Sequence, residues 1–135
     1  MMRSIKKKAL LAGTILGILA IVLGAFAAHR LKVLFSVEAL ESFKTGVSYQ
    51  QFIALFLLVI PVVEHQIKRS LGIVYRLSLL GVILFSGSIY CLNMNSQLWH
   101  FNFPFFLPLL TPIGGLLMIA AFVTLLIQII KSNSN

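Results

Sequence analysis

The residues of this sequence that carry acid, base or metal-binding chemistry are few and far apart. They are three carboxylates and three imidazoles, namely Glu38, Glu41, Glu64, His29, His65 and His100. None of their spacings matches a catalytic acid pair, a nucleophile beside a base, or a set of metal ligands. The sequence therefore predicts a protein that is not an enzyme and that uses no catalytic residue, metal ion or cofactor.

A second group of polar residues lies inside apolar runs. In the stretch LFSGSIY, Ser86 and Ser88 flank Gly87, and Tyr90 follows two residues later. Small residues and hydroxyl groups let helices approach closely and bond to one another in lipid. We interpret this stretch as a packing surface against the first or the fourth apolar segment, with one wall of a small polar pocket as the alternative.

The stretch TPIGG is typical of the start of a helix. Thr111 would be the N-cap and Pro112 the first helical residue. Gly114 and Gly115 would then lie in the first turn, where free backbone N–H groups attract anions, although Pro112 removes one of those donors.

The composition of the chain is that of a membrane protein. Of its 135 residues, 59% are apolar and 10% are charged, whereas soluble domains carry about 25% charged residues. The net charge of +8 is divided among short clusters between apolar runs. This pattern marks membrane boundaries and does not form the basic face of a nucleic-acid binder. A single cysteine, Cys91, leaves no internal disulfide.

Four segments are long and apolar enough to cross a bilayer, at residues 9–28, 46–63, 71–92 and 112–130. Backbone groups in lipid must pair within the protein, so these segments should be helices. Strands are excluded because no segment alternates with a period of two. We predict an all-α integral membrane protein with one domain, residues 1–135, and four transmembrane helices in a compact bundle.

The distribution of Lys and Arg predicts the orientation. With the N-terminus inside, the inner ends hold eight basic residues: Arg3, Lys6, Lys7, Lys8, Lys68, Arg69, Arg76 and Lys131. The outer loops hold three, Arg30, Lys32 and Lys44. Both termini should therefore be cytoplasmic.

The first apolar segment ends in VLGAFAAHRLK, which fits either a signal cleavage site or the end of a retained helix. Signal peptides have an apolar core of about 7–15 residues, whereas residues 9–28 form a full span, so we expect the helix to stay. One face carries small residues and predicts close helix packing; these residues are Gly13, Gly17, Ala20, Gly24 and Ala28. His29 should lie at the outer headgroups.

The second helix is predicted to begin outside the bilayer, near Val37, with Ser36 as its N-cap. Its apolar face is formed by Val37, Leu40, Phe43 and Val47. The opposite face carries Glu38 and Glu41, which we interpret as hydrated acids at the interface. The alternative is a functional acid pair.

Residues 98–110 read LWHFNFPFFLPLL, with five aromatic residues and two prolines. Aromatic side chains favour the membrane interface. Because residues 112–130 span the bilayer alone, the segment 98–110 should form an outer flap, either interfacial or re-entrant.

Four stretches together resemble the domain of unknown function 423 family of small four-helix membrane proteins. They are GAFAAH (24–29), SYQQF (48–52), LFSGSIY (84–90) and LTPIGG (110–115). The family often has Gly, His and Trp where this chain has Ala27, Ile53 and Phe122. The resemblance implies four helices and residence in a membrane, which we expect to be the cytoplasmic (inner) membrane of a bacterium. It implies no activity.

The family-motif positions are the candidate site: Gly24, His29, Tyr49, Gln50, Ser86, Gly87, Ser88, Tyr90, Thr111, Pro112, Gly114 and Gly115. The leading hypothesis is a non-enzymatic protein that acts by helix packing with the lipid bilayer, with a membrane protein partner or as a homo-oligomer. A small oligomeric transporter or channel is the first alternative. A lipid or quinone site lined by Tyr49, Ser86, Tyr90 and Thr111 is the second.

Overall fold

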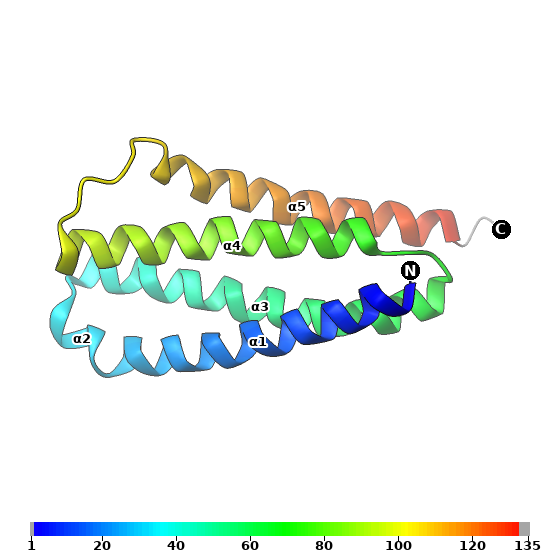
Figure 1. Ribbon diagram of the computed structural model, residues 1–135, viewed down its shortest axis with the longest axis horizontal. Coiled ribbons are helices and arrows are strands. Elements are labelled where there is room, and N and C mark those ends of the chain that lie inside the picture. The colour runs from blue at the N-terminus through cyan, green and yellow to red at the C-terminus, as the bar shows by residue number, and fades with distance from the viewer. Residues whose placement is uncertain (1, 133–135) are drawn as a thin grey trace.

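The computed structural model describes residues 2–132, with side chains from Ile5 onward, and the described chain is helical without strands (Figure 1). Arg3, one of the predicted inner cations, lies outside the residues whose side chains are described. The elements are α1 (Met2–Ala28), α2 (Leu31–Leu34), α3 (Val37–Ile67), α4 (Gly72–Met94), the π-helix η1 (Asn95–Trp99) and α5 (Leu107–Ser132).

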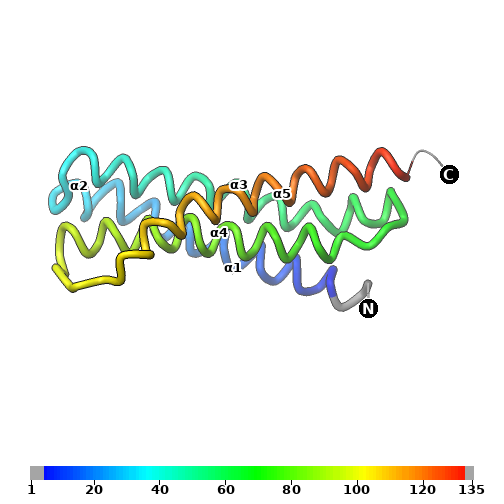
Figure 2. The backbone as a smooth tube through the Cα atoms, turned by 90° about the horizontal axis from the view of Figure 1, so that it is seen from above, coloured from blue at the N-terminus to red at the C-terminus, as the bar shows by residue number. Residues whose placement is uncertain are grey.

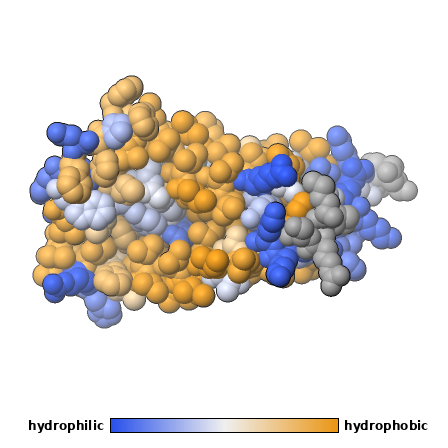
Figure 3. All heavy atoms as spheres, in the orientation of Figure 1, coloured by the Kyte–Doolittle hydropathy of each residue, from blue (hydrophilic) through white to orange (hydrophobic). Residues whose placement is uncertain are grey.

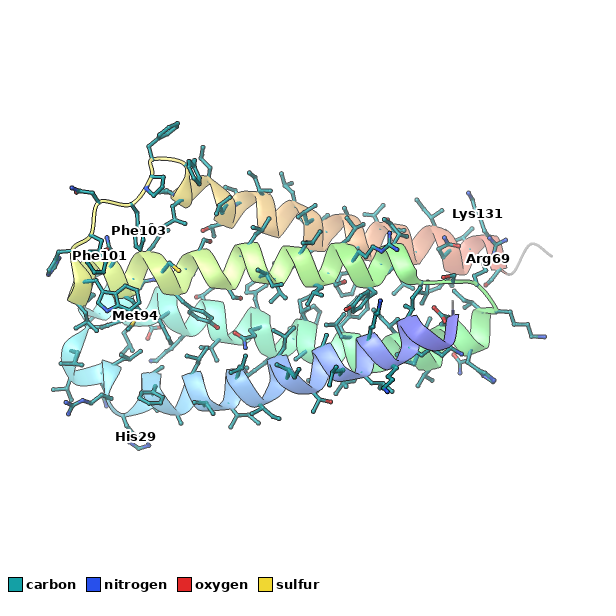
Figure 4. The ribbon with its side chains drawn as sticks, in the orientation of Figure 1. His29, Arg69, Met94, Phe101, Phe103 and Lys131 are labelled. Carbon is teal, nitrogen blue, oxygen red and sulfur yellow. The ribbon has the colours of Figure 1, made fainter. Side chains whose placement is uncertain are left out.

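Helices α3 and α4 form the centre of the bundle. Helix α1 packs mainly on α3, and α5 packs mainly on α4, so that α1 and α5 lie on the two outer sides (Figures 1 and 2). The start of α1, the α3–α4 turn and the end of α5 all lie at one end (Figure 1). There, Arg69 Nη2 donates to the carbonyl of Lys131 over 3.3 Å (Figure 4).

The outer surface is apolar between two polar ends. Figure 3 shows a broad hydrophobic band over the middle of the molecule, with hydrophilic residues gathered at both ends. Within the described chain, α1, α3, α4 and α5 each carry a segment long and apolar enough to cross a membrane. A face this large and apolar needs lipid as its solvent. The all-α membrane fold predicted from the sequence is confirmed, while the exact limits of each span stay a prediction.

The sequence predicts a small-residue packing face on α1, and in the structure this face contacts α3. A Cβ atom on Gly13 would lie 2.8 Å from the Ala54 carbonyl oxygen, so only glycine permits this helix contact. Ala20 is also fully buried. The prediction is wrong for the last member of the face, because Ala28 is exposed and Ala27 is buried in its place.

Helix α3 begins where the sequence predicts. The Ser36 hydroxyl accepts a hydrogen bond from the backbone N–H of Ala39 over 3.2 Å, which is N-cap geometry. Leu40, Phe43 and Val47 are buried beneath α2 and the end of α1. Val37 is 75% exposed, so its assignment to the apolar face is wrong. As the first helical residue, it lies beyond the reach of the neighbouring helices.

Helix α5 begins at Leu107, and the predicted start at Thr111 and Pro112 is wrong. Pro108 lies in the first turn, where the proline ring costs no intrahelical bond. Pro112 lies one turn later, inside the helix. The anion-binding hypothesis for Gly114 and Gly115 fails for the same reason, because their N–H groups lie in the helix interior.

The flap is consequently shorter than predicted. Residues 98–99 belong to η1 and residues 107–110 to α5, which leaves residues 100–106 as the non-helical connection. The Asn95 side chain holds it in place, accepting from the Phe101 N–H over 2.6 Å and donating to the Phe101 carbonyl over 3.0 Å. Whether the flap lies at the interface or enters the bilayer stays a prediction.

Glycine at the crossing of α4 and α5 is required by the backbones themselves. A Cβ atom on Gly114 would lie 2.6 Å from the Gly81 carbonyl oxygen and would also meet the backbone nitrogen of Phe85. These atoms belong to helix backbone and cannot turn aside. A Cβ atom on Gly115 would instead make ordinary contact, 3.8 Å from the Phe85 ring.

We therefore expect Gly114→Ala to lower the free energy of unfolding by about 1–3 kcal/mol, the usual cost of overpacking. Gly115→Ala, one residue away on the same helix, is the matched control and should change stability little. Thermal unfolding of both variants in one detergent measures the difference. Equal melting temperatures for the two variants would contradict the close α4–α5 crossing.

Candidate functional site

Gln50 is the polar residue on which three helices meet. It lies in the middle of α3 and is 4% exposed. Its Nε2 donates to the Leu16 carbonyl on α1 over 2.9 Å, and its Oε1 accepts from the Tyr90 hydroxyl on α4 over 2.7 Å. These two hydrogen bonds offset the desolvation cost of burying the amide in an apolar environment.

Ser86 adds a second bond between α3 and α4. Its hydroxyl donates to the Gly46 carbonyl over 2.7 Å, and it is buried. Gly46 must be glycine here, because a Cβ atom would lie 2.9 Å from the Tyr90 ring. The missing side chain leaves room for the Tyr90 ring against α3, so that the Tyr90 hydroxyl reaches Gln50.

Ser88 and Thr111 connect α4 with α5. Their hydroxyl oxygens are 2.6 Å apart, and the Ser88 hydroxyl also lies 2.9 Å from the Phe85 carbonyl. Thr111 is therefore a cross-helix partner and not the N-cap that the sequence predicts. The SGS stretch was predicted to pack against the first or fourth helix. The stretch contacts the fourth apolar segment, which is α5, through Ser88. Ser86 bonds to α3 and not to α1.

A groove between α1 and α4 has the polar side chains of Gln50, Ser86 and Tyr90 at its base. Its volume is about 290 Å³, and its walls are the apolar side chains Leu16, Leu19, Val22, Leu23, Val82 and Ile83. Gln50, Ser86 and Tyr90 line the same groove together with Gly87. A Cβ atom on Gly87 would meet nothing within 4 Å, so the glycine opens the groove and is not needed for helix contact. Four of the predicted positions therefore gather at one place.

A second groove separates α3 from α5 and is aromatic. Tyr49 is 45% exposed there, with its ring centroid 4.7 Å from that of Phe85. Phe122 stacks on Phe52 and on Phe56, with centroids 5.6 and 4.4 Å apart. Gly115 lies in this groove, whose volume is about 360 Å³. Tyr49 and Gly115 are thus separated from the Gln50 cluster.

The other predicted positions lie apart from both clusters. Gly24 is at the α1–α3 contact, Gly114 is at the α4–α5 crossing, and Pro112 is exposed on α5. His29 is exposed and points away from the bundle (Figure 4). Its position is that of an anchor at the end of α1, and it does not face the polar side of α3.

The acids divide into two kinds. Glu38 and Glu41 are exposed, and Glu41 pairs with Lys44 over 2.9 Å at the surface, which fits hydrated acids. Glu64 is near the end of α3 and is fully buried within the protein. Its Oε2 accepts from the Leu71 N–H over 2.8 Å, while Oε1 has no partner among the described residues.

Two polar features were missed by sequence reasoning. Asn93 donates to the Ser42 hydroxyl over 3.0 Å and so adds another α3–α4 bond. Glu64 follows Ile60 by four residues, and that spacing on the buried face of α3 was the signal available in the sequence. Among the described residues, no group of three His, Cys, Asp or Glu side chains is placed to hold a metal ion.

Comparison with known proteins gives matches over nearly the whole chain. The family model described as a protein of unknown function (DUF423) matches residues 23–115. A UPF0382 membrane protein of Haemophilus influenzae is 31% identical over 96% of this chain and 98% of its own. The UPF0382 inner membrane protein YgdD of Escherichia coli K12 is 32% identical over 90% of this chain and 88% of its own. The UPF0382 membrane protein YwdK of Bacillus subtilis is 30% identical over 90% of this chain and 95% of its own. No solved structure gives a significant match.

The Gln50–Tyr90 hydrogen bond can be tested by comparing Tyr90, in the α1–α4 groove, with Tyr49, in the α3–α5 groove. Tyr90→Phe removes the hydroxyl that bonds to Gln50, and we expect the free energy of unfolding to fall by about 0.6 kcal/mol and at most about 1.7 kcal/mol, the average and the maximum measured for hydrogen bonds between membrane helices. Tyr49→Phe is the control, because no hydrogen bond of its hydroxyl is found within the described chain. Unfolding of both variants in mixed micelles gives the two values. A loss that is equal in both variants would contradict the assigned role of Tyr90.

Proposed function

The chain belongs to the DUF423 family of proteins of unknown function, and on that premise we propose that it acts without catalysis, as a helix scaffold working through lateral contacts with membrane lipid. The observation that carries the proposal is the use of the motif side chains. Gln50, Ser86, Ser88 and Tyr90 all bond across helices, which is the geometry of a structural framework.

This arrangement supports a scaffold more than an oligomeric transporter. Residues of a conducting path need free polar groups toward water, together with a membrane-embedded acid or a ring of charges. Here the side chains of Gln50, Ser86 and Tyr90 at the base of the groove each form a hydrogen bond within the bundle, and the groove walls are apolar. The buried acid, Glu64, lies near the α3–α4 turn, and one of its carboxylate oxygens accepts a hydrogen bond from the Leu71 backbone N–H.

A homo-oligomer is the second candidate, and the α3–α5 groove favours it. Tyr49, Phe52 and Phe122 expose aromatic surface side by side along this groove. Aromatic side chains are enriched where protein surfaces meet. A second copy, or the helix of a membrane protein partner, would bury this surface without a change in the bundle.

We further propose that the protein lies in the bacterial cytoplasmic membrane with both termini in the cytoplasm. The end that holds Lys68, Arg69 and Lys131 carries the larger share of basic residues, which favours the inner side. The name of the Escherichia coli relative, an inner membrane protein, supports the same membrane.

The orientation is tested by fusing a reporter after Asn135. A fluorescent protein that folds only in the cytoplasm should be bright in this fusion, whereas an alkaline phosphatase fused at the same position should be inactive. A parallel pair of fusions after Phe35, in the opposite connection, should give the reverse result. An active phosphatase at Asn135 would show that the termini are outside.

The scaffold proposal is tested by thiol accessibility in sealed membrane vesicles. In a Cys91→Ser background, Ser86→Cys places a thiol at the base of the groove, and we expect it to resist a membrane-impermeant maleimide from either side. Asn102→Cys, in the exposed flap, is the control and should react fully from one side. Rapid labelling of S86C would indicate a water-filled path and would support the transporter.

A further inference from the structure

Gln51 is an exposed amide on the apolar surface of the bundle. It follows the buried Gln50 and lies on the exposed side of α3. No hydrogen bond of its side chain is found within the part of the chain that the structure describes. A polar group that faces lipid without a partner is costly, because hydrocarbon offers it neither a donor nor an acceptor. The Gln51 amide therefore needs a partner from another molecule.

Two other exposed polar side chains on this face are satisfied within their own helices. The Thr14 hydroxyl donates to the Leu10 carbonyl over 2.8 Å, and the Ser48 hydroxyl donates to the Lys44 carbonyl over 3.0 Å. A hydroxyl group that bonds to its own helix in this way needs no further partner in lipid. Gln51 forms no such bond, and this sets it apart from its polar neighbours on α1 and α3.

Gln51 lies at a depth that neither water nor lipid headgroups reach. It lines a groove between α1 and α3 together with Gly17 and Ile18. Ile18 precedes Ala28, the last residue of α1, by ten residues, which is about 15 Å at helical rise. The hydrocarbon core of a bilayer is about 30 Å thick, so this level is close to its middle. The partner of the amide must itself be a polar group buried in the bilayer.

A second Gln51 amide is a partner that meets this condition. An amide has one carbonyl oxygen, which accepts, and two N–H groups, which donate. Two copies of the chain related by a two-fold axis along the membrane normal bring Gln51 to the same depth in each copy. Each Gln51 then donates one N–H to the carbonyl oxygen of the other. The acyl chains of lipid carry no such group at this level.

The surface around Gln51 has the shape for such a contact. The α1–α3 groove has a volume of about 450 Å³. Gly17 gives it room, because a Cβ atom there would meet only the Ala54 side chain, at 3.9 Å. Ile18 and Leu55 line the same groove and are 57% and 65% exposed. An apolar side chain of one copy can therefore enter the groove of the other, as small residues permit at helix interfaces in lipid.

The charged residues nearer the outer end of α3 are compatible with a two-fold contact. Lys44 lines a second groove that also includes Ser48 and Gln51. Its ammonium group pairs with Glu41 over 2.9 Å. Because this pair carries no net charge, two copies of the face do not repel each other through it.

We propose that two copies of the chain form a two-fold dimer through the α1–α3 face, with reciprocal hydrogen bonds between their Gln51 side chains at its centre. Ile18 and Leu55 of each copy pack around this pair. The interface lies on a different side of α3 from the aromatic α3–α5 groove. The inference goes beyond the proposed contacts with lipid and does not require them.

Cysteine cross-linking in native membranes tests which face of the bundle meets a second copy. In a Cys91→Ser background, Leu55→Cys places a thiol one turn from Gln51 in the α1–α3 groove. A membrane-permeant oxidant should join two such copies by a disulfide. Ile119→Cys is the matched control, because Ile119 is 61% exposed but lines the α3–α5 groove. This variant should stay monomeric on a non-reducing gel.

The contribution of the amide is measured as the dimerisation constant of the purified full-length protein in lipid bilayers, by single-molecule photobleaching. Gln51→Leu should weaken dimerisation about tenfold, which corresponds to two hydrogen bonds between membrane helices. Thr14→Val, in the same groove, should leave dimerisation unchanged, because the Thr14 hydroxyl is already bonded within α1. The melting temperature of monomeric Q51L should match that of the wild type, since the Gln51 amide forms no bond within the described chain.

The proposal is overturned if the wild-type protein stays monomeric in bilayers at high protein density, a result that would assign the Gln51 amide to a different membrane protein. It is also overturned if Q51L dimerises as the wild type does. Cross-linking of I119C without cross-linking of L55C would overturn it as well, and would support a dimer through the α3–α5 groove. The scaffold proposal is tested separately, because labelling of S86C does not depend on dimerisation.

Discussion

The buried amide of Gln50 is the interaction on which the arrangement of the bundle depends. In lipid the hydrophobic effect does not hold helices together, so packing and interhelical hydrogen bonds must do so. Gln50 bonds to α1 through Leu16 and to α4 through Tyr90. Because α1 makes few contacts with α4, this side chain connects the two helices through α3, at the base of the groove between them.

The remaining cross-helix contacts follow from the same constraint. Glycines permit the close backbone approach at the α1–α3 and α4–α5 contacts, through Gly13 and Gly114, and hydroxyl groups connect the helices where they come close. The exception is Gly87, which opens space instead of closing it. That difference separates glycines that build the bundle from a glycine that shapes a surface.

The sequence predicted the fold class and the start of α3, because length, apolar content and the Ser36 cap are local properties. It placed the start of α5 too late, since two prolines one turn apart, Pro108 and Pro112, both fit a first helical turn. The site was predicted only as a set of residues. The bond from Gln50 to Leu16 joins positions 34 residues apart and ends on a backbone carbonyl, so no side-chain pattern announces it.

The central claim is that Gln50 bonds α1 to α3 and α4 in the membrane. Solid-state NMR in lipid bilayers tests it most directly, through the dipolar coupling between ¹⁵N at the Gln50 side-chain amide and ¹³C at the Leu16 carbonyl. The distance of 2.9 Å from Nε2 to the Leu16 oxygen predicts a weak but measurable coupling to the carbonyl carbon, which disappears in Gln50→Leu. The absence of any measurable coupling in the folded wild-type protein would contradict the account.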